Sequence, residues 1–127
     1  MKAPKLIEFK SKLETRGNLS FTEGVEQVPF DIKRVYWLYD VPEGQQRGGH
    51  AHKSAEQVIV CTKGQIKLEL ESKNGEKLDF ILDSPKVGLY IPPFWWRKML
   101  FNEQAMMIGL ASDGFLEEDY IRTKSDF

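Results

Sequence analysis

Short alternating segments separated by turn signals run through most of this chain, and they restrict it to a β-sheet fold. Residues 65–71, QIKLELE, alternate apolar and polar side chains, and residues 77–82, KLDFIL, are expected to pair back against them. Between them stands Asn74-Gly75, a pair typical of a two-residue hairpin turn. Similar segments recur at a spacing of roughly ten residues, as in antiparallel sandwiches and barrels. The sequence therefore predicts an all-β domain, which a jelly roll (a double-stranded β-helix) accommodates best.

The other segments bring the prediction to roughly eight to ten strands. Strands are expected at residues 5–9, 19–22, 30–40, 57–62, 87–91 and 105–111, with turns at Arg16-Gly17-Asn18, Gly64 and Asn102-Glu103. The tail, residues 115–127, is expected to form one or two helical turns. One domain over residues 1–127 is expected from this length.

The segment 30–40, FDIKRVYWLYD, carries a further signal in its alternation. A period of two places Arg34 and Tyr36 on one face with Ile32 and Leu38. An arginine and a tyrosine that share a face with aliphatic side chains indicate a lined cavity rather than a dry core.

Charge and hydropathy exclude several classes of partner. The formal net charge of −1 gives no electrostatic basis for binding nucleic acid or an anionic membrane. No apolar run is long enough to span a membrane, and the first ten residues lack the apolar core of a signal peptide. The single cysteine, Cys61, excludes an intramolecular disulfide and is expected to be a buried thiol. We therefore expect a soluble cytoplasmic protein that binds neither nucleic acid nor membrane.

The stretch 44–56, GQQRGGHAHKSAE, holds both histidines of the chain. On a β-strand, His50 and His52 would point to the same face, because side chains two residues apart do so. Neutral imidazole accepts or donates a proton near pH 7. A pair of imidazoles beside Arg47 therefore indicates acid–base chemistry more than simple packing.

The spacing of this stretch resembles the first cupin motif. Gly44, His50, His52, Glu56 and Gly64 stand in the order of that motif, with one extra residue before the final glycine. The resemblance implies a cupin jelly roll, in agreement with the strand pattern.

Metal binding is not expected, because the second cupin motif is incomplete. A cupin metal is usually held by three histidines and a glutamate, and where the third histidine belongs this chain has Trp96-Arg97-Lys98. His50, His52 and Glu56 alone would make a facial triad for iron(II). An arginine at the vacant position would repel a divalent cation by roughly 8 kcal/mol at about 4 Å and an effective dielectric of about 20. We expect neither a metal nor another cofactor, and elemental analysis would test the alternative of an iron-dependent oxygenase.

A closer resemblance covers nearly the whole chain. The chain is similar to the cupin sugar 3,4-ketoisomerases in the strings TRGNL, VPFDIKRVYWLYD, RGGHAHK, EQVIVCTKG, SPKVGLYIPPFWWRKM, LASD and EEDYIR. Those isomerases convert dTDP-4-keto-6-deoxy-D-glucose to a 3-keto sugar, from which an aminotransferase makes 3-amino-3,6-dideoxyhexoses for surface polysaccharides. The resemblance implies the same reaction on a dTDP-linked 4-keto-6-deoxy sugar.

The resemblance also implies roles for individual residues. His50 matches the base that removes the C3 proton, and Tyr36 matches the tyrosine that shuttles protons beside it. His52 matches the second histidine, which is expected to orient the sugar or to tune His50. Guanidinium groups suit sugar oxygens and diphosphate, so substrate contacts are expected from Arg16, Arg34, Arg47 and Arg97.

Two of these arginines leave alternatives open. Arg34 either touches the substrate or pairs with a carboxylate such as Glu56. In the family, Arg and His at the positions of Arg16 and Arg97 resemble the members that form a galacto product, whereas Tyr and Arg resemble those that form a gluco product. This chain has two arginines, and Arg97 lies in the better-matched string, which favours the gluco product.

The resemblance further implies a homodimer with exchanged N-terminal strands. The segment 5–9 is too short to be stable alone, and the loop after it is polar. Swapping such an element is a low-cost route to a dimer.

Two other functions fit the same motifs. An epimerase of 4-keto sugars would exchange protons at C3 and C5 without moving the ketone. A sugar-nucleotide-binding domain without activity would bind the same ligand and show no turnover.

Overall fold

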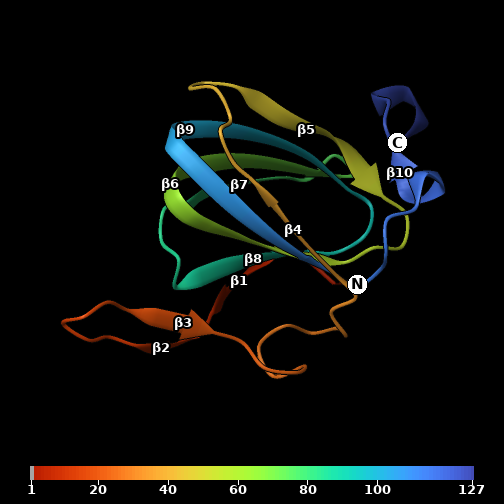
Figure 1. The fold of residues 1–127 in the computed structure, drawn as a ribbon. Coiled ribbons are helices and arrows are strands. Elements are labelled where there is room, and N and C mark those ends of the chain that lie inside the picture. Colours follow the sequence, from red (N-terminus) through yellow and green to blue (C-terminus); the bar gives the residue numbers. More distant parts are fainter. Residues whose placement is uncertain (1) are drawn as a thin grey trace.

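Two long antiparallel strands, β6 (Gln57–Ser72) and β9 (Trp95–Ala111), form the centre of the fold (Figure 1). The computed structural model describes residues 2–127, which form ten strands and two single-turn 3-10 helices and confirm the all-β prediction. The other strands are β1 (Lys5–Glu8), β2 (Lys10–Lys12), β3 (Leu19–Phe21), β4 (Arg34–Leu38), β5 (Gln46–His52), β7 (Lys77–Leu82), β8 (Val87–Ile91) and β10 (Tyr120–Ile121). The 3-10 turns are η1 (Glu117–Asp119) and η2 (Lys124–Asp126).

Each long strand pairs with different neighbours at its two ends, which produces the two halves of the jelly roll. The first half of β6 pairs with β8, and its second half pairs with β7. The first half of β9 pairs with β5, and its second half pairs with β4. Strand β1 extends one half beside β8, and β10 extends the other beside β5. The two halves therefore enclose a space that opens between β4 and β5.

The two long strands bend together at Gly64. Its φ is +75°, and a Cβ there would lie 2.6 Å from the carbonyl oxygen of Glu103. Glu103 and Gln104 also have positive φ, and the register of β6 against β9 shifts nearby. The sequence predicts turns at Gly64 and at Asn102-Glu103, and this is wrong: the chain bulges within continuous strands instead of reversing.

The segment 30–40 differs from its prediction, whereas the tail agrees with its own. The segment 30–40 is a strand only over Arg34–Leu38, because the residues before it pack on the outside of the sheet rather than pair with it. Val28 and Phe30 are buried there in a cluster with Tyr90. The tail forms two isolated 3-10 turns on either side of β10, in agreement with the predicted one or two helical turns.

The main core lies between the two halves. Its buried members are Ile59, Cys61, Ile66, Leu68, Leu70, Leu82, Leu89, Ile91, Trp95, Met99, Phe101, Ala105 and Met107. Trp96 points the other way, into a small outer cluster with Ala51 and Ile121 that is covered by Phe127. Trp95 and Trp96 are therefore packing residues.

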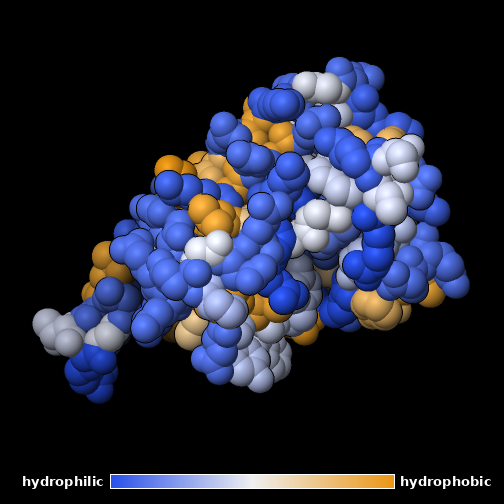
Figure 2. Space-filling model, turned by 90° about the horizontal axis from the view of Figure 1, so that it is seen from above, coloured by the Kyte–Doolittle hydropathy of each residue, from blue (hydrophilic) through white to orange (hydrophobic). Residues whose placement is uncertain are grey.

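The β2–β3 hairpin projects from the barrel as an arm (Figure 1). The face seen in Figure 2 is largely hydrophilic, with separate hydrophobic patches. Within residues 2–127, no helix is long and apolar enough to cross a membrane.

Candidate active site

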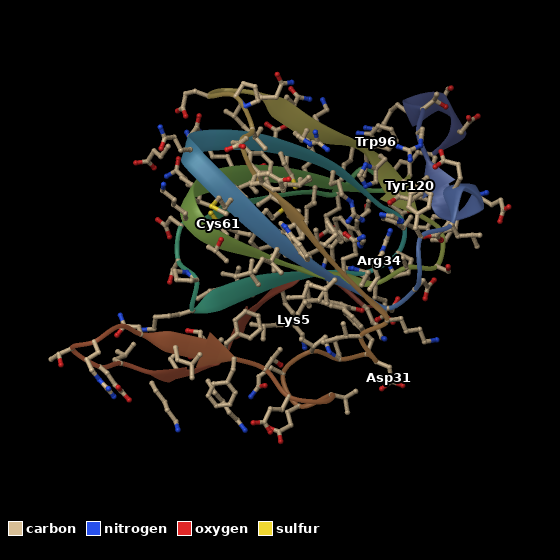
Figure 3. All side chains as sticks on the ribbon, viewed as in Figure 1. Lys5, Asp31, Arg34, Cys61, Trp96 and Tyr120 are labelled. Atoms are coloured by element: carbon tan, nitrogen blue, oxygen red, sulfur yellow. The ribbon has the colours of Figure 1, made fainter. Side chains whose placement is uncertain are left out.

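A cavity of about 740 Å³ lies where the two halves of the sheet open, between β4 and β5. Strand β4 provides Arg34, Tyr36 and Leu38 from alternate positions, as the sequence predicts. Val35 and Trp37 face outward and are 51% and 61% exposed. Figure 3 shows Arg34 and Tyr120 on the same side of the barrel, away from Cys61. The remaining lining residues are Tyr39, Asp40, Val41, Pro42, Gln45, Gln46, Arg47, Gly48, His50, Gln57, Arg97, Met99, Met107, Tyr120 and Arg122.

His50 and His52 lie on one face of β5, with ring centroids 5.0 Å apart in an edge-on arrangement. His50 lines the cavity, whereas His52 is fully buried behind the wall and does not line it. A bulge at Gly48 sets this geometry. Gly48 has φ +91°, and a Cβ there would lie 2.8 Å from the carbonyl oxygen of Arg97. The glycine therefore allows β5 to approach β9 closely just before the histidines.

Gln57 joins the polar groups of the cavity wall. Its Oε1 accepts hydrogen bonds from the Tyr36 hydroxyl at 2.9 Å and from Arg97 Nη1 at 3.2 Å. Its Nε2 lies 3.4 Å from Nε2 of His52. Gln57 and Arg97 are almost completely buried, so the Gln57 side chain fixes the positions of Tyr36 and Arg97.

The C-terminal segment supplies the partner of His52. Asp119 Oδ2 lies 2.8 Å from His52 Nδ1, and its Oδ1 accepts from the backbone N–H and the hydroxyl of Ser54 at 2.6 and 2.8 Å. Tyr120 packs against the imidazoles of His50 and His52, with centroids 5.1 and 4.4 Å away. The tail therefore closes the site from the side of β5.

Three of the predicted arginines line the cavity, and one does not. Within residues 2–127, Arg34, Arg47 and Arg97 form no ion pair, and Asp40 is the one carboxylate of the lining. The buried Nε atoms of Arg34 and Arg97 have no acceptor in that part of the chain. Because buried donors are rarely left unpaired, these guanidinium groups mark a site for an anionic or oxygen-rich ligand.

Arg16 stands apart from this group. It lies in the turn of the projecting β2–β3 hairpin, with a side chain 90% exposed and 3.4 Å from Glu14. It does not line the cavity of its own chain.

Tyr36 is protonated and Arg97 is charged at neutral pH. Burial raises the pKa of Tyr36, although Arg97 and Arg34 oppose this. Burial lowers the pKa of Arg97 to about 10, which still leaves the guanidinium protonated. The stacking of the Arg34 guanidinium over the Tyr36 ring, 5.4 Å from its centroid, holds the two side chains together.

Both histidines are neutral at pH 7. Burial lowers the pKa of His50 to about 3, with further contributions from the charge of Arg97 and from His52. Burial and Arg97 lower the pKa of His52 to about 4, although Asp119 opposes this. Burial acts to raise the pKa of Asp119, but the hydrogen bonds from Ser54 and His52 outweigh it and lower that pKa. His50 is therefore unprotonated at neutral pH, with a lone pair available at the cavity wall.

These pKa values predict that acid destabilises the fold between pH 6.5 and 5. Unfolded histidine titrates near pH 6.5, so below that pH the unfolded chain binds more protons than the folded one. The stabilising effect is fully present above pH 6.5 and is lost toward pH 4. Urea unfolding at pH 7 and pH 5 should show a decrease of up to about 4 kcal/mol in the free energy of unfolding, if each histidine contributes about 1.4 kcal/mol per pH unit. The variant His50→Asn should halve the decrease, and an unfolding free energy that stays constant from pH 7 to 5 would contradict the assignment.

The metal triad of His50, His52 and Glu56 does not form, because Glu56 lies apart from the two histidines. Glu56 does not line the cavity; it accepts a hydrogen bond from Tyr90 and pairs with Lys2 at 3.0 Å. Glu56 also does not pair with Arg34, so the predicted alternative of an Arg34–Glu56 ion pair is wrong. Within residues 2–127, no three His, Cys, Asp or Glu side chains are grouped so that they could hold a metal ion.

Sequence reasoning missed four residues of the site: Gln57, Asp119, Tyr120 and Arg122. The signals were present, because Gln57 lies in EQVIVCTKG and the other three lie in EEDYIR, two strings that carry the family resemblance. The hydrogen-bond partners of these residues follow from strand pairing over long sequence distances, which local patterns do not reveal.

Comparisons with known proteins agree with this geometry. Residues 2–127 match the family described as FdtA: WxcM-like, C-terminal. A TDP-4-oxo-6-deoxy-alpha-D-glucose-3,4-oxoisomerase of Aneurinibacillus thermoaerophilus is 43% identical over 124 residues, which cover 97% of this chain and 88% of that protein.

Two solved structures are similar over nearly their whole length. One is a histidine-to-asparagine mutant of the 3,4-ketoisomerase QdtA from Thermoanaerobacterium thermosaccharolyticum in complex with TDP-4-keto-6-deoxyglucose. It superimposes with a TM-score of 0.93 at 38% identity, covering 99% of this chain and 91% of that one. The other, the TDP-quinovose 3,4-ketoisomerase WlaRB from Campylobacter jejuni, gives a TM-score of 0.91 at 35% identity, with 99% and 97% covered.

Proposed function

We propose that the chain is a sugar 3,4-ketoisomerase acting on TDP-4-keto-6-deoxyglucose, because it belongs to the family described as FdtA: WxcM-like, C-terminal. The observation that carries the proposal is the shared cavity of His50 and Tyr36, whose lining includes three arginines without carboxylate partners, Arg34, Arg47 and Arg97. The chemistry needs a base, a proton shuttle and donors for developing oxyanions, and this wall offers all three. The diphosphate of the substrate suits the guanidinium groups of the lining.

The reaction then proceeds through an enediol without consuming a protein group. Neutral His50 removes the C3 proton, the C3–C4 double bond forms, and the carbonyl oxygen on C4 takes the proton of Tyr36. Tyr36 recovers a proton from the C3 hydroxyl as the C3 carbonyl forms, and protonated His50 delivers its proton to C4. Arg97, held by Gln57, is placed to stabilise the charge on the sugar oxygens. The product is a TDP-3-keto-6-deoxyhexose, a substrate for an aminotransferase on a route to 3-amino-3,6-dideoxyhexoses.

A single assay distinguishes the candidate functions. The purified protein is incubated with TDP-4-keto-6-deoxyglucose and a chelator in deuterium oxide, and proton NMR follows the sugar. A ketoisomerase gives a new 3-keto sugar, with deuterium at C4 to the extent that protonated His50 exchanges with the solvent before it delivers its proton. Exchange at C3 and C5 with the ketone still at C4 would instead identify an epimerase, and no exchange would leave a binding domain.

The configuration of the product at C4 is proposed to be gluco. Arg97, the arginine of the gluco-forming pair, is held in the cavity by Gln57. The C3–C4 and C4–C5 proton coupling constants of the product, reduced with borohydride to remove the ketone, report that configuration.

A homodimer with exchanged N-terminal strands gives Arg16 a place in the site. In the single chain, β1 pairs with β8 in the register Lys5↔Tyr90, and the hairpin that carries Arg16 points away from the barrel (Figure 1). An exchange would let the partner supply the same strand and bring its hairpin toward the neighbouring barrel. The outward-facing Val35 and Trp37 on β4 are the apolar side chains that such an interface would cover.

We predict that His50→Asn and Arg16→Ala chains, each impaired alone, regain activity when they are unfolded and refolded together. In an exchanged dimer, one of the two mixed sites combines an intact His50 with an intact Arg16 from the other chain. If Arg16 acts within its own chain, mixing restores nothing. Refolding either variant with itself is the control, and a sedimentation mass equal to one chain would remove the dimer.

A further inference from the structure

A buried row of polar side chains runs behind the cavity wall. It starts at Asp119, passes through His52 and Gln57, and ends at Tyr36 and Arg97, with successive distances of 2.8, 3.4, 2.9 and 3.2 Å. Asp119 and His52 do not line the cavity. At the far end, the Tyr36 hydroxyl and Arg97 do line it. The row therefore connects a carboxylate outside the site to two groups inside it.

The chemistry of the end groups fixes the direction of every hydrogen bond in the row. Arg97 can only donate, so the Gln57 atom that faces it must be the carbonyl oxygen. The amide nitrogen of Gln57 then faces Nε2 of His52, which must offer a lone pair. The proton of the neutral imidazole is therefore on Nδ1, where it donates to the Asp119 carboxylate. Every other arrangement would place two hydrogen-bond donors opposite each other somewhere in the row.

Asp119 is itself firmly held. Its second oxygen accepts both the backbone N–H and the hydroxyl of Ser54. Position 119 therefore needs two acceptor oxygens, one for Ser54 and one for His52. Only a carboxylate satisfies both sides.

Resting on the proposed function, we propose that Asp119 is a positioning residue for the ketoisomerase reaction. It holds His52 in the Nδ1–H tautomer, His52 orients the amide of Gln57, and Gln57 holds the Tyr36 hydroxyl and Arg97. Gln57 thereby fixes the Tyr36 oxygen at the cavity wall, from which the hydroxyl turns its proton away from Gln57 and toward the C4 carbonyl oxygen when the sugar binds. His52 thus acts through the wall and does not itself touch the sugar.

The variant Asp119→Asn tests this directly. If the new amide nitrogen faces His52, the imidazole must move its proton to Nε2, where it meets the amide nitrogen of Gln57. We expect kcat to fall about 10- to 100-fold with KM within about threefold, since a buried unmade hydrogen bond costs about 1–3 kcal/mol. Nitrogen NMR of the imidazole should report the change from the Nδ1–H to the Nε2–H tautomer. The matched control is Asp113→Asn, because Asp113 Oδ2 also lies 2.8 Å from the Ser54 hydroxyl but does not touch His52; its kcat and tautomer should be those of the wild type.

A second substitution should reverse the polarity of the whole row and restore it. In the double variant Asp119→Asn with Gln57→Glu, the amide at 119 donates to Nδ1, Nε2–H donates to the new carboxylate at 57, and that carboxylate still accepts from Tyr36 and Arg97. We expect the double variant to recover at least about tenfold in kcat over Asp119→Asn alone, as a coupled network requires. Losses that simply add, with His52 keeping the Nδ1–H tautomer in Asp119→Asn, would overturn the proposal.

The tautomer measurement needs no substrate, so it separates the two proposals. If wild type shows no turnover but the tautomer changes as described, the row exists and the function is wrong. If wild type isomerises the sugar and Asp119→Asn keeps full kcat, the function stands and the positioning role fails.

Discussion

Replacing His50 with asparagine is expected to lower kcat for sugar isomerisation by about 10²- to 10⁴-fold, the usual contribution of one positioned base. His50 is the one imidazole of the chain that lines the cavity, because His52 is buried behind it. Asparagine retains polar atoms at this position but cannot accept the C3 proton at neutral pH. Binding of TDP, measured by calorimetry, should stay within a few-fold of the wild type, because the arginines of the lining remain.

The neighbouring strand provides a matched control. Lys98→Asn replaces an exposed side chain next to Arg97 on β9 and should leave kcat unchanged. If His50→Asn keeps more than a tenth of wild-type kcat, His50 is not the base. A second readout is available, because a bound diphosphate is negatively charged and should raise the low pKa of His50 that burial and Arg97 cause. Proton NMR titration with and without TDP would detect that increase.

Tyr36→Phe is the second change expected to remove most of the activity, with a decrease in kcat of about 10²- to 10⁴-fold. In the proposed reaction the phenol moves a proton between the two sugar oxygens, and phenylalanine keeps the ring but removes the hydroxyl. The loss of the hydroxyl also leaves Gln57 Oε1 with Arg97 as its remaining donor. Deuterium exchange at C3 should persist in this variant at a measurable rate, because His50 is intact. Loss of exchange together with turnover would indicate that Tyr36 acts earlier, in the removal of the proton.

Gly109→Ala should produce a similar loss without touching a reacting group. Gly109 lies opposite Tyr36 in the pairing of β4 with β9, and a Cβ there would be 2.2 Å from Cζ of the Tyr36 ring. Since the overlap is impossible, the ring must move, and its hydroxyl leaves Gln57. We expect the free energy of unfolding to decrease by about 1–3 kcal/mol, the usual cost of overpacking. Normal activity in a folded Gly109→Ala protein would show that the position of Tyr36 is not critical.

The family resemblance is confirmed by the match over residues 2–127, and the fold class by the strands themselves. Alternation along β4 correctly placed Arg34 and Tyr36 on one face, and alternation along β5 did the same for His50 and His52. The predicted turns at Gly64 and Asn102-Glu103 are wrong for a physical reason. Glycine and positive φ serve bulges as well as reversals, and only the pairing of β6 with β9 distinguishes the two.

Glu56 and Gln57 show how strongly a site depends on register. The cupin motif drew attention to Glu56, but Gln57 is the side chain that faces the cavity, and Glu56 contacts Lys2 and Tyr90 outside it. A shift of one residue along a strand exchanges its two faces. The extra residue between Glu56 and Gly64 in the motif spacing was the sign in the sequence that Gln57, and not Glu56, faces the cavity.

The sequence by itself determined the β architecture, the shared face of the two imidazoles and the kinship with the sugar ketoisomerases. These follow from the two-residue period of a pleated strand and from strings of neighbouring residues, which are local properties. The tertiary structure decided which histidine reaches the cavity, which side chain holds Tyr36, and that His52 finds its carboxylate in Asp119, 67 residues away. Contacts of that kind depend on how distant strands pair and where they bend, and both are set by packing of the whole chain.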